Sequence, residues 1–467
     1  MILIKININD IPINYWERVK YTLTEIGSRV GIKFILTPDE EAIKYTPYKD
    51  RESYRDCDFF FDKRCYEQPN PSTSSTTNLP SFSDSRHDSD FIGYCFFHLM
   101  LFGEYYVENL SKNQDGNFLS KDLPEFKKEH AKVAHVDEKC AEIAKRLSKR
   151  EEKQFFDPNY SFGFCLTHDT DQINLCNPKE IAYNFVKYAL RRDSAFFNKA
   201  KDGLKDLIRK KDSWDLFGSW QLAKLEISPS PSCFYLSCIS SAKPTVNDVR
   251  SHIFNSQVNL DAIKFLSDQG HEFGFHPCIN AKLSQKEFSL SKKLIQDRLG
   301  LNLFGVRHHY WSLDWRSPYK TYRKQVNAGF RYDASMAWKD IEGFRSGTCM
   351  PYKTFDTFRN RCMDHYILPT AIMDGHLLPS TIDLPNEIAL TAENRFKNIL
   401  NQVKRYKGIL VVDWHTECLK YSYHGKNNFN FIQGLIQKYI NSAESLQATP
   451  WDFIQRYHDH RKSYMVT

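Results

Sequence analysis

The chain has 467 residues, which is long for a single hydrophobic core, so we expect two domains. Hydrophobic residues make up 41% of it and charged residues 26%, the balance of a globular protein. The net charge of +7 is modest for this length. It does not favour a nucleic-acid-binding protein, which usually concentrates its basic residues in one domain.

The cysteine pattern and the first residues of the chain indicate whether the protein is exported or stays in the cytoplasm. Twelve cysteines are scattered without a CxxC pair, which is typical of reduced thiols in the cytosol and not of a disulfide framework. Residues 1–6 alternate like a strand and lack the longer apolar stretch of a secretory signal. The longest apolar run, 91–103, is too short to span a bilayer. We therefore expect a cytoplasmic protein without a membrane span.

Residues 1–150 are expected to form a smaller N-terminal α/β domain of unknown role. Residues 2–36 show a strand-and-helix pattern, and an apolar helix is expected around 91–106. Between them, residues 69–90 are rich in Ser, Thr, Pro, Asn and Asp, which predicts a mobile loop. A charged stretch, 145–153, separates this domain from the rest of the chain.

From residue 156 to residue 467 short apolar runs alternate with helical patterns. Strands are expected near 162–166, 233–238, 272–275, 304–306, 366–368 and 409–412, and helices between them, such as 260–268 and 392–406. Strand and helix in repeated alternation predict parallel strands with helical crossovers. In such folds the functional groups lie at the carboxyl ends of the strands.

Four of these strand ends carry ionisable or metal-binding side chains. They are the segments 167–171, 276–280, 307–310 and 413–415. Asp169 and Asp171 both stay ionised only if a cation or an arginine lies between them, and a divalent metal held by one of them and His276 meets that need. The alternative is that these aspartates cap a helix. Arg307 is expected to pair with Asp169, and the near-neutral pKa of histidine makes His415 a candidate general acid.

Five segments together resemble the ordered motifs of the polysaccharide deacetylase family, also called carbohydrate esterase family 4 or the NodB homology domain. They are THDTD (167–171), GHEFGFHPCIN (270–280), GVRHHYW (305–311), YDASMAW (332–338) and VVDWH (411–415). The match runs from about Ser161 to about Tyr457. It is closer to a bacterial subgroup with THDVD-type and HPSYN-type motifs and an extra N-terminal domain. The resemblance implies a distorted (β/α) barrel with seven strands.

The resemblance also implies roles for individual residues. Asp169 matches the catalytic base, and Arg307 the arginine that tethers it. His415 matches the catalytic acid, and Asp333 the aspartate that tunes this acid. Asp171 matches the carboxylate metal ligand.

The remaining metal ligands are implied by the second motif. His276 matches the first histidine ligand, whereas Asn280 stands where the family usually has its second histidine. His309 or His308 is an alternative source of the missing nitrogen. Thr170 separates the two aspartates, which are adjacent in most family members, so which of them binds metal stays open. The implied cofactor is a divalent metal, first of all Zn²⁺, with Co²⁺, Mn²⁺ and Ni²⁺ as alternatives.

Three further residues are candidates for substrate contacts, namely His309, Tyr310 and Arg345. Arg345 lies in the glycine-containing segment 343–349, where a structural turn is the alternative. Asp374 also follows a strand, and we expect it to be structural. The basic, amphipathic run 191–211 is expected to be the solvated face of a helix or a contact with anionic lipid.

Together these observations predict a carbohydrate deacetylase, a hydrolase acting on C–N bonds other than peptide bonds. Its expected substrate is an acetylated amino sugar or glycan of surface polysaccharide or lipopolysaccharide biosynthesis, with a lipid-linked form as one option. Two alternatives remain at this point. One is a metal-dependent amidohydrolase for a non-sugar amide, and the other is a catalytically inactive glycan-binding or scaffold protein.

Overall fold

The computed structural model describes most of the chain. The described residues are 2–47, 58–69, 80, 90–106, 117, 119–123, 130–147, 157–171, 178–192, 194–208, 230–237, 257–378, 386–416, 425–440 and 443–467. The expected mobile loop over 69–90 lies almost entirely outside them, and so does the expected domain boundary near residue 150.

The N-terminal part contains a small parallel sheet and several helices. Its strands are β1 (Ile2–Asn7), β2 (Ile32–Leu36), β3 (Ile43–Thr46) and β4 (Phe59–Phe60), and its helices are α1 (Trp16–Val30), α2 (Phe91–Leu99) and α4 (His135–Leu147). The four strands are parallel, in the order β2-β1-β3-β4. Gly31 ends α1 in a left-handed conformation (φ 74°), which lets the chain turn straight into β2.

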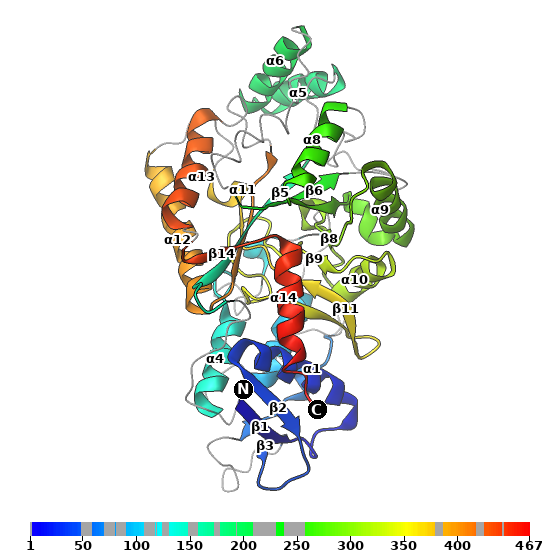
Figure 1. Ribbon diagram of the computed structural model, residues 1–467, viewed down its shortest axis with the longest axis vertical. Helices are drawn as coiled ribbons and strands as arrows, with labels where there is room; N and C mark the ends of the chain where they lie inside the picture. Colours follow the sequence, from blue (N-terminus) through cyan, green and yellow to red (C-terminus); the bar gives the residue numbers. More distant parts are fainter. Residues whose placement is uncertain are drawn as a thin grey trace.

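The rest of the chain builds a ten-stranded, curled sheet (Figure 1). Its strands are β5 (Phe162–Thr170), β6 (Cys233–Ser237), β7 (Glu272–His276), β8 (Gly305–Val306), β9 (Tyr332–Asp333), β10 (Tyr352–Asp356), β11 (Arg361–Ile367), β12 (Ile372–Met373), β13 (Ile409–Asp413) and β14 (Ser445–Gln447). The order is β10-β11-β9-β8-β7-β6-β5-β13-β12, and β14 pairs with the start of β5. Only the β10–β11 pair is antiparallel among the described residues.

Helices connect these strands and cover the outside of the sheet (Figure 1). They are α5 (Pro178–Arg191), α6 (Ser194–Ile208), α8 (Gln257–Asp268), α9 (Gln285–Leu299), α10 (Pro318–Asn327), α11 (Asp374–Leu377), α12 (Asn386–Arg405), α13 (Gly425–Tyr439) and α14 (Pro450–Lys462). The prediction of parallel strands with helical crossovers is therefore confirmed. The finer prediction of a seven-stranded barrel is not, because the strand pairings of the described residues give an open order.

One hydrophobic cluster joins the N-terminal unit to strands β10 and β11 of the curled sheet. Phe96 of α2 packs edge-on against Phe355 of β10, and Tyr21 of α1 contacts the same ring. The last helix, α14, lies against α1, where buried Arg461 donates to Glu25 at 2.6 Å (Figure 1). The N-terminal unit is thus packed onto the larger part of the chain through aromatic side chains and a buried ion pair.

None of the helices in the described residues combines the length and apolarity needed to cross a bilayer. Eight of the twelve cysteines belong to the described residues, and all eight are free thiols.

Candidate metal centre and active site

Strand β5 ends in a row of polar side chains on one side of the sheet. Successive side chains of a strand alternate between its two faces, so Thr167, Asp169 and Asp171 point the same way. Thr167 lies opposite Asp413 of the neighbouring strand β13. The carboxyl ends of β5 and β13 therefore place three carboxylates close to one another.

Arg307, which follows β8, lies between two of these carboxylates. Its Nη1 atom is 3.1 Å from Asp169 and 3.0 Å from Asp413, and its Nη2 donates to the Thr167 hydroxyl at 2.6 Å. Burial lowers the pKa of Arg307, but Asp413 and Asp169 outweigh burial and raise it above the usual value. The expected contact between Arg307 and Asp169 is thus present, and Asp413 shares it.

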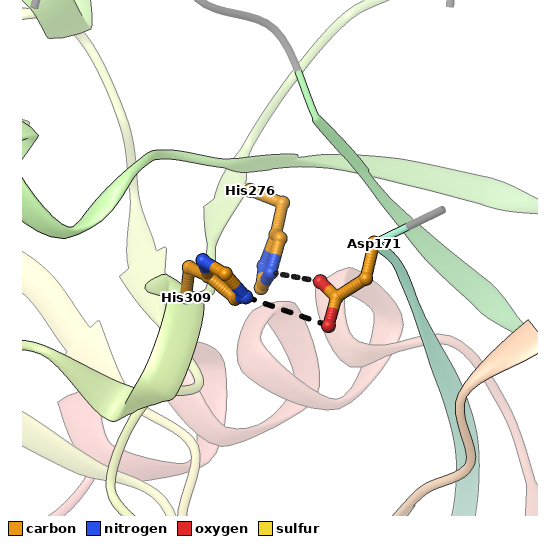
Figure 2. A group of neighbouring side chains, drawn as sticks. All are labelled: Asp171, His276 and His309. Atoms are coloured by element: carbon orange, nitrogen blue, oxygen red, sulfur yellow. Dashed lines mark hydrogen bonds and ion pairs between the residues drawn. The ribbon is translucent and has the colours of Figure 1, made fainter. Parts of the chain in front are cut away.

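Asp171 forms a compact group with two histidines (Figure 2). Its Oδ1 is 2.9 Å from Nε2 of His276 at the end of β7, and its Oδ2 is 3.5 Å from Nε2 of His309. One ligand atom from each residue lies within 4.8 Å of the other two. One carboxylate and two imidazoles at this spacing form a donor set that suits a divalent transition metal.

The ring of His276 is oriented for metal binding by its other nitrogen. Its Nδ1 lies 2.7 Å from the backbone carbonyl of Arg307 and donates to it. Nε2, the other ring nitrogen, faces Asp171 and His309 and is the atom that would bind a metal in place of its proton. Metal-binding histidines are commonly fixed by such a bond from their second nitrogen, so the residues present fit a metal.

The charge state of Asp171 is set by the same neighbours. Burial raises the pKa of this carboxyl group, but the charge of His309 and the hydrogen bond from His276 outweigh burial, and the pKa lies well below its usual range. Asp171 is therefore a carboxylate, the form that binds metal.

His309 reaches this group from a strained turn. Tyr310 and Trp311, the two residues after it, both have φ of 54°, a left-handed conformation that is unusual for bulky side chains. The amide of Asn117 in the N-terminal part donates to the Tyr310 carbonyl at 3.1 Å. A contact from the N-terminal unit therefore supports the turn that presents His309.

His308 points away from the group. It is fully buried, its Nε2 lies 3.0 Å from the amide of Gln325 and 4.0 Å from Asp333, and burial holds its pKa well below the usual value. Of the two alternatives for the missing imidazole, the geometry favours His309. Asn280 lies half-buried in the short 3₁₀ helix Ile279–Leu283, and its place in the ligand set stays a prediction.

Asp374, not Asp333, is the partner of His415. Nδ1 of His415 lies 3.0 and 3.1 Å from the two carboxylate oxygens of Asp374, and the backbone amide of His415 donates to the same carboxylate at 2.7 Å. Asp333 instead accepts from Gln325 at 2.5 Å and from the Ser335 amide at 2.6 Å. The implied tuning of His415 by Asp333 stays a prediction without a direct contact between them, and Asp374 is more than the structural residue we expected.

Asp374 changes the chemistry of His415. Burial lowers the pKa of the imidazole, but Asp374 and then Asp413 outweigh burial and raise the pKa well above its usual value. Nε2 of His415 points toward Asp171, 3.7 Å away. These carboxylates favour the protonated imidazole, which is the form that a general acid needs.

A second group of possible ligands, Asp169, Asp413 and His415, lies next to the first. Its two carboxylates already share the Arg307 guanidinium at 3.0–3.1 Å, and Asp413 keeps a pKa well above its usual value because of burial and the Asp169 charge. Arginine thus provides the positive charge in this half of the site. The first group, with its two imidazoles, suits a metal better.

The structure separates the three residues expected to contact substrate. His309 belongs to the metal group, and Tyr310 is 40% exposed with its ring centroid 4.4 Å from that of His309. Arg345 is only 1% exposed, donates to Glu104 at 3.0 Å and lies over the Trp315 ring. Arg345 therefore joins the N-terminal unit to the larger part of the chain, which corrects its expected role in contacting substrate.

Comparisons with known proteins give fold neighbours only. No family model and no curated protein matches the chain. A crystal structure assigned as a polysaccharide deacetylase from Mycobacterium smegmatis matches with a TM-score of 0.40 and 13% identity, over 67% of this chain and 94% of that one. Another, assigned likewise and from Pseudomonas aeruginosa PAO1, matches with a TM-score of 0.39 and 11% identity, over 66% and 95%. At this level of similarity we draw no function from them.

Proposed function

We propose that this chain is a metal-dependent hydrolase that removes the N-acetyl group from an amino sugar. The observation that carries the proposal is that a set of three possible metal ligands lies next to a candidate base and a candidate acid. Asp171, His276 and His309 bring their ligand atoms within 4.8 Å of one another. Beside them lie the carboxylate of Asp169, which contacts Arg307, and the imidazole of His415, which contacts Asp374.

The proposed metal ligands are Asp171, His276 and His309, with Asn280 as a further oxygen donor. A divalent ion at these residues would lower the pKa of a water molecule and polarise the acetyl carbonyl. Two imidazoles and one carboxylate fit Zn²⁺, and Co²⁺, Mn²⁺ and Ni²⁺ accept the same donors.

The chain's own residues supply the proton transfers. Asp169, whose carboxylate contacts Arg307 at 3.1 Å, takes the proton of the attacking water. His415, kept protonated by Asp374, gives a proton to the nitrogen of the departing amine as the C–N bond breaks. Water thus adds across the amide bond, and the products are acetate and the free amino sugar.

The sugar assignment rests on the motifs and on the surroundings of the site. The five motif segments resemble those of enzymes that act on acetylated glycans. The partly exposed ring of Tyr310 lies beside the candidate metal ligands, where a flat apolar surface suits a sugar ring. We place the reaction in the cytoplasm, in the assembly of a surface polysaccharide or lipopolysaccharide.

The test is release of acetate from a panel of N-acetylated amino sugars and of small non-sugar amides, with the purified protein supplied with Zn²⁺, Co²⁺, Mn²⁺ or Ni²⁺. We expect acetate from a sugar substrate with the wild type and with the control D459N, whose carboxylate is exposed. D169N should release acetate more slowly, by on the order of 100-fold or more. Acetate from non-sugar amides alone would contradict the sugar assignment, and none from any amide would favour the glycan-binding alternative.

A further inference from the structure

Two helices project from one end of the molecule. Helices α5 and α6 lie side by side beyond α8, at the end opposite the two chain termini (Figure 1). Arg192, with φ of 54°, makes the turn between them. Phe197 of α6 packs against Tyr188 and Phe185 of α5, with ring centroids 5.1 and 6.2 Å apart. The two helices therefore form a hairpin with its own small aromatic contact, which we call the α5–α6 hairpin.

The α5–α6 hairpin exposes large apolar side chains. Leu190 is 78% exposed, Ile208 73% and Val186 55%. Three more residues of α6 are about two-fifths exposed, namely Phe197, Leu204 and Leu207. Single exposed apolar residues are ordinary on protein surfaces, but several on one small element mark an interaction site.

Basic side chains accompany these apolar ones. Residues 178–211 contain ten Lys or Arg and four Asp or Glu. On α6, Lys201 follows Phe197 by one turn and precedes Leu204, so the three lie along one face. On α5, Lys187 and Arg191 directly follow Val186 and Leu190. Among the described residues no ion pair is recorded for Lys187, Arg191 or Lys201.

The hairpin is tied to the active-site end of the sheet. Helix α5 begins at Pro178, seven residues after Asp171. Seven residues of chain span at most about 25 Å, so the start of the hairpin cannot lie farther than this from the candidate metal ligand. The first turn of the hairpin is therefore held within this distance of the site.

We propose that the α5–α6 hairpin docks the protein onto an anionic membrane surface. The apolar side chains of the hairpin enter the boundary between headgroups and acyl chains. The aliphatic parts of lysine and arginine lie along this apolar surface, and their charged ends reach the anionic headgroups. Each basic residue near such a surface raises membrane binding roughly fivefold. The inference rests on the proposed function. It implies that the substrate is an acetylated glycan linked to a lipid in the same membrane.

The charge of the hairpin argues against a second copy of the chain as the occupant. A two-fold contact would place the same surface against itself. Residues 178–208 carry seven Lys or Arg and four Asp or Glu in each copy, so the two like-charged surfaces would repel each other. An anionic lipid surface is complementary to both the charge and the apolar side chains.

Co-sedimentation of the full-length protein with vesicles tests this inference. We expect binding to vesicles of phosphatidylcholine with phosphatidylglycerol, little binding to phosphatidylcholine alone, and weaker binding as salt rises from roughly 0.1 to 0.5 M. The variant L190S/I208S should lose about tenfold in binding, and R191E/K201E, which reverses two charges, should lose about 25-fold or more. Matched controls are I13S/F358S, at 78% and 77% exposed apolar positions elsewhere, and K293E/K462E, at exposed lysines elsewhere.

The outcomes separate this inference from the proposed function. Equal binding by the variants and their controls would overturn the inference, and so would a wild type that does not prefer anionic vesicles. A dimer in size-exclusion chromatography that L190S/I208S dissociates, without vesicle binding, would overturn it in favour of self-association.

Turnover separates the inference from the proposed function. With a water-soluble acetylated sugar, the hairpin variants should keep wild-type turnover. They should lose turnover only for a substrate that is anchored in vesicles. Absence of turnover in every form, with vesicle binding intact, would contradict the proposed function alone.

Discussion

The carboxylate of Asp374 holds the imidazole of His415 through both of its oxygens, 3.0 and 3.1 Å from Nδ1. The same carboxylate accepts the backbone amide of His415 at 2.7 Å. One side chain thus fixes the position, the tautomer and the charge of the proposed general acid. Nε2, the nitrogen left for catalysis, points toward Asp171.

Replacing Asp374 by Asn should move the alkaline limb of the pH–rate profile to lower pH. The negative charge of Asp374 is the main influence that raises the pKa of His415 against the effect of burial. Without it the imidazole loses its proton at lower pH, and the amine leaves unassisted. The measurement is kcat against pH for the wild type and D374N.

D333N is the control for that experiment. Asp333 lies with Gln325 and Ser335, so this variant should keep the position of the alkaline limb. A shift in D333N equal to that in D374N would contradict the assignment of Asp374 as the partner of His415.

Asp169→Asn should keep the metal and lose the reaction. Asn cannot take a proton from water, and removal of a general base costs on the order of 100-fold or more in rate. Elemental analysis of the purified variant should still find metal, because Asp171, His276 and His309 are unchanged. Near-normal turnover in D169N would show that another group is the base.

Arg307→Met should destabilise the fold as well as the site. The guanidinium is fully buried between Asp169 and Asp413, and its loss leaves two buried carboxylates without a cation. Removing one partner of a buried ion pair costs about 3–5 kcal/mol. Urea denaturation of R307M measures this cost, and R331M, which breaks an ion pair with exposed Asp364, is the matched control. Equal free energies of unfolding for R307M and R331M would contradict this account.

Asp333 should make the protein less stable as pH rises. Burial raises its pKa from 3.8 to about 6, so the folded protein binds this proton more tightly than the unfolded chain does. The stability that Asp333 contributes is therefore full below pH 3.8 and is lost as pH rises through about 6. D333N should abolish this part of the pH dependence, which amounts to roughly 3 kcal/mol at most. Denaturation at a series of pH values tests it, and an unchanged dependence in D333N would contradict it.

Much of the site could be predicted from the sequence because short apolar runs indicate where each strand ends. Short apolar runs that end in Asp or His place those side chains at one edge of a parallel sheet. Asp169, Asp171, His276 and His415 meet there in the structure. The alternation of side chains along β5 also explains how Asp169 and Asp171 share one face although Thr170 separates them.

The remaining features depend on packing that the sequence does not display. Asp374 follows β12, a strand of only two residues, and β12 pairs with β13 next to His415. Its partnership with His415 comes from that pairing and not from a pattern. Arg345 is covered by Glu104 of the N-terminal unit, and periodicity along the chain carries no information on contacts so distant.

Metal content tests the central claim most directly. Purified wild-type protein and the variants H309A and N280A should be analysed for Zn, Co, Mn and Ni after exposure to each ion. We expect close to one ion per chain in the wild type, a loss of it in H309A, and most of it retained in N280A. An absence of bound metal from the wild type, or metal in H309A equal to that in the wild type, would contradict the metal centre described here.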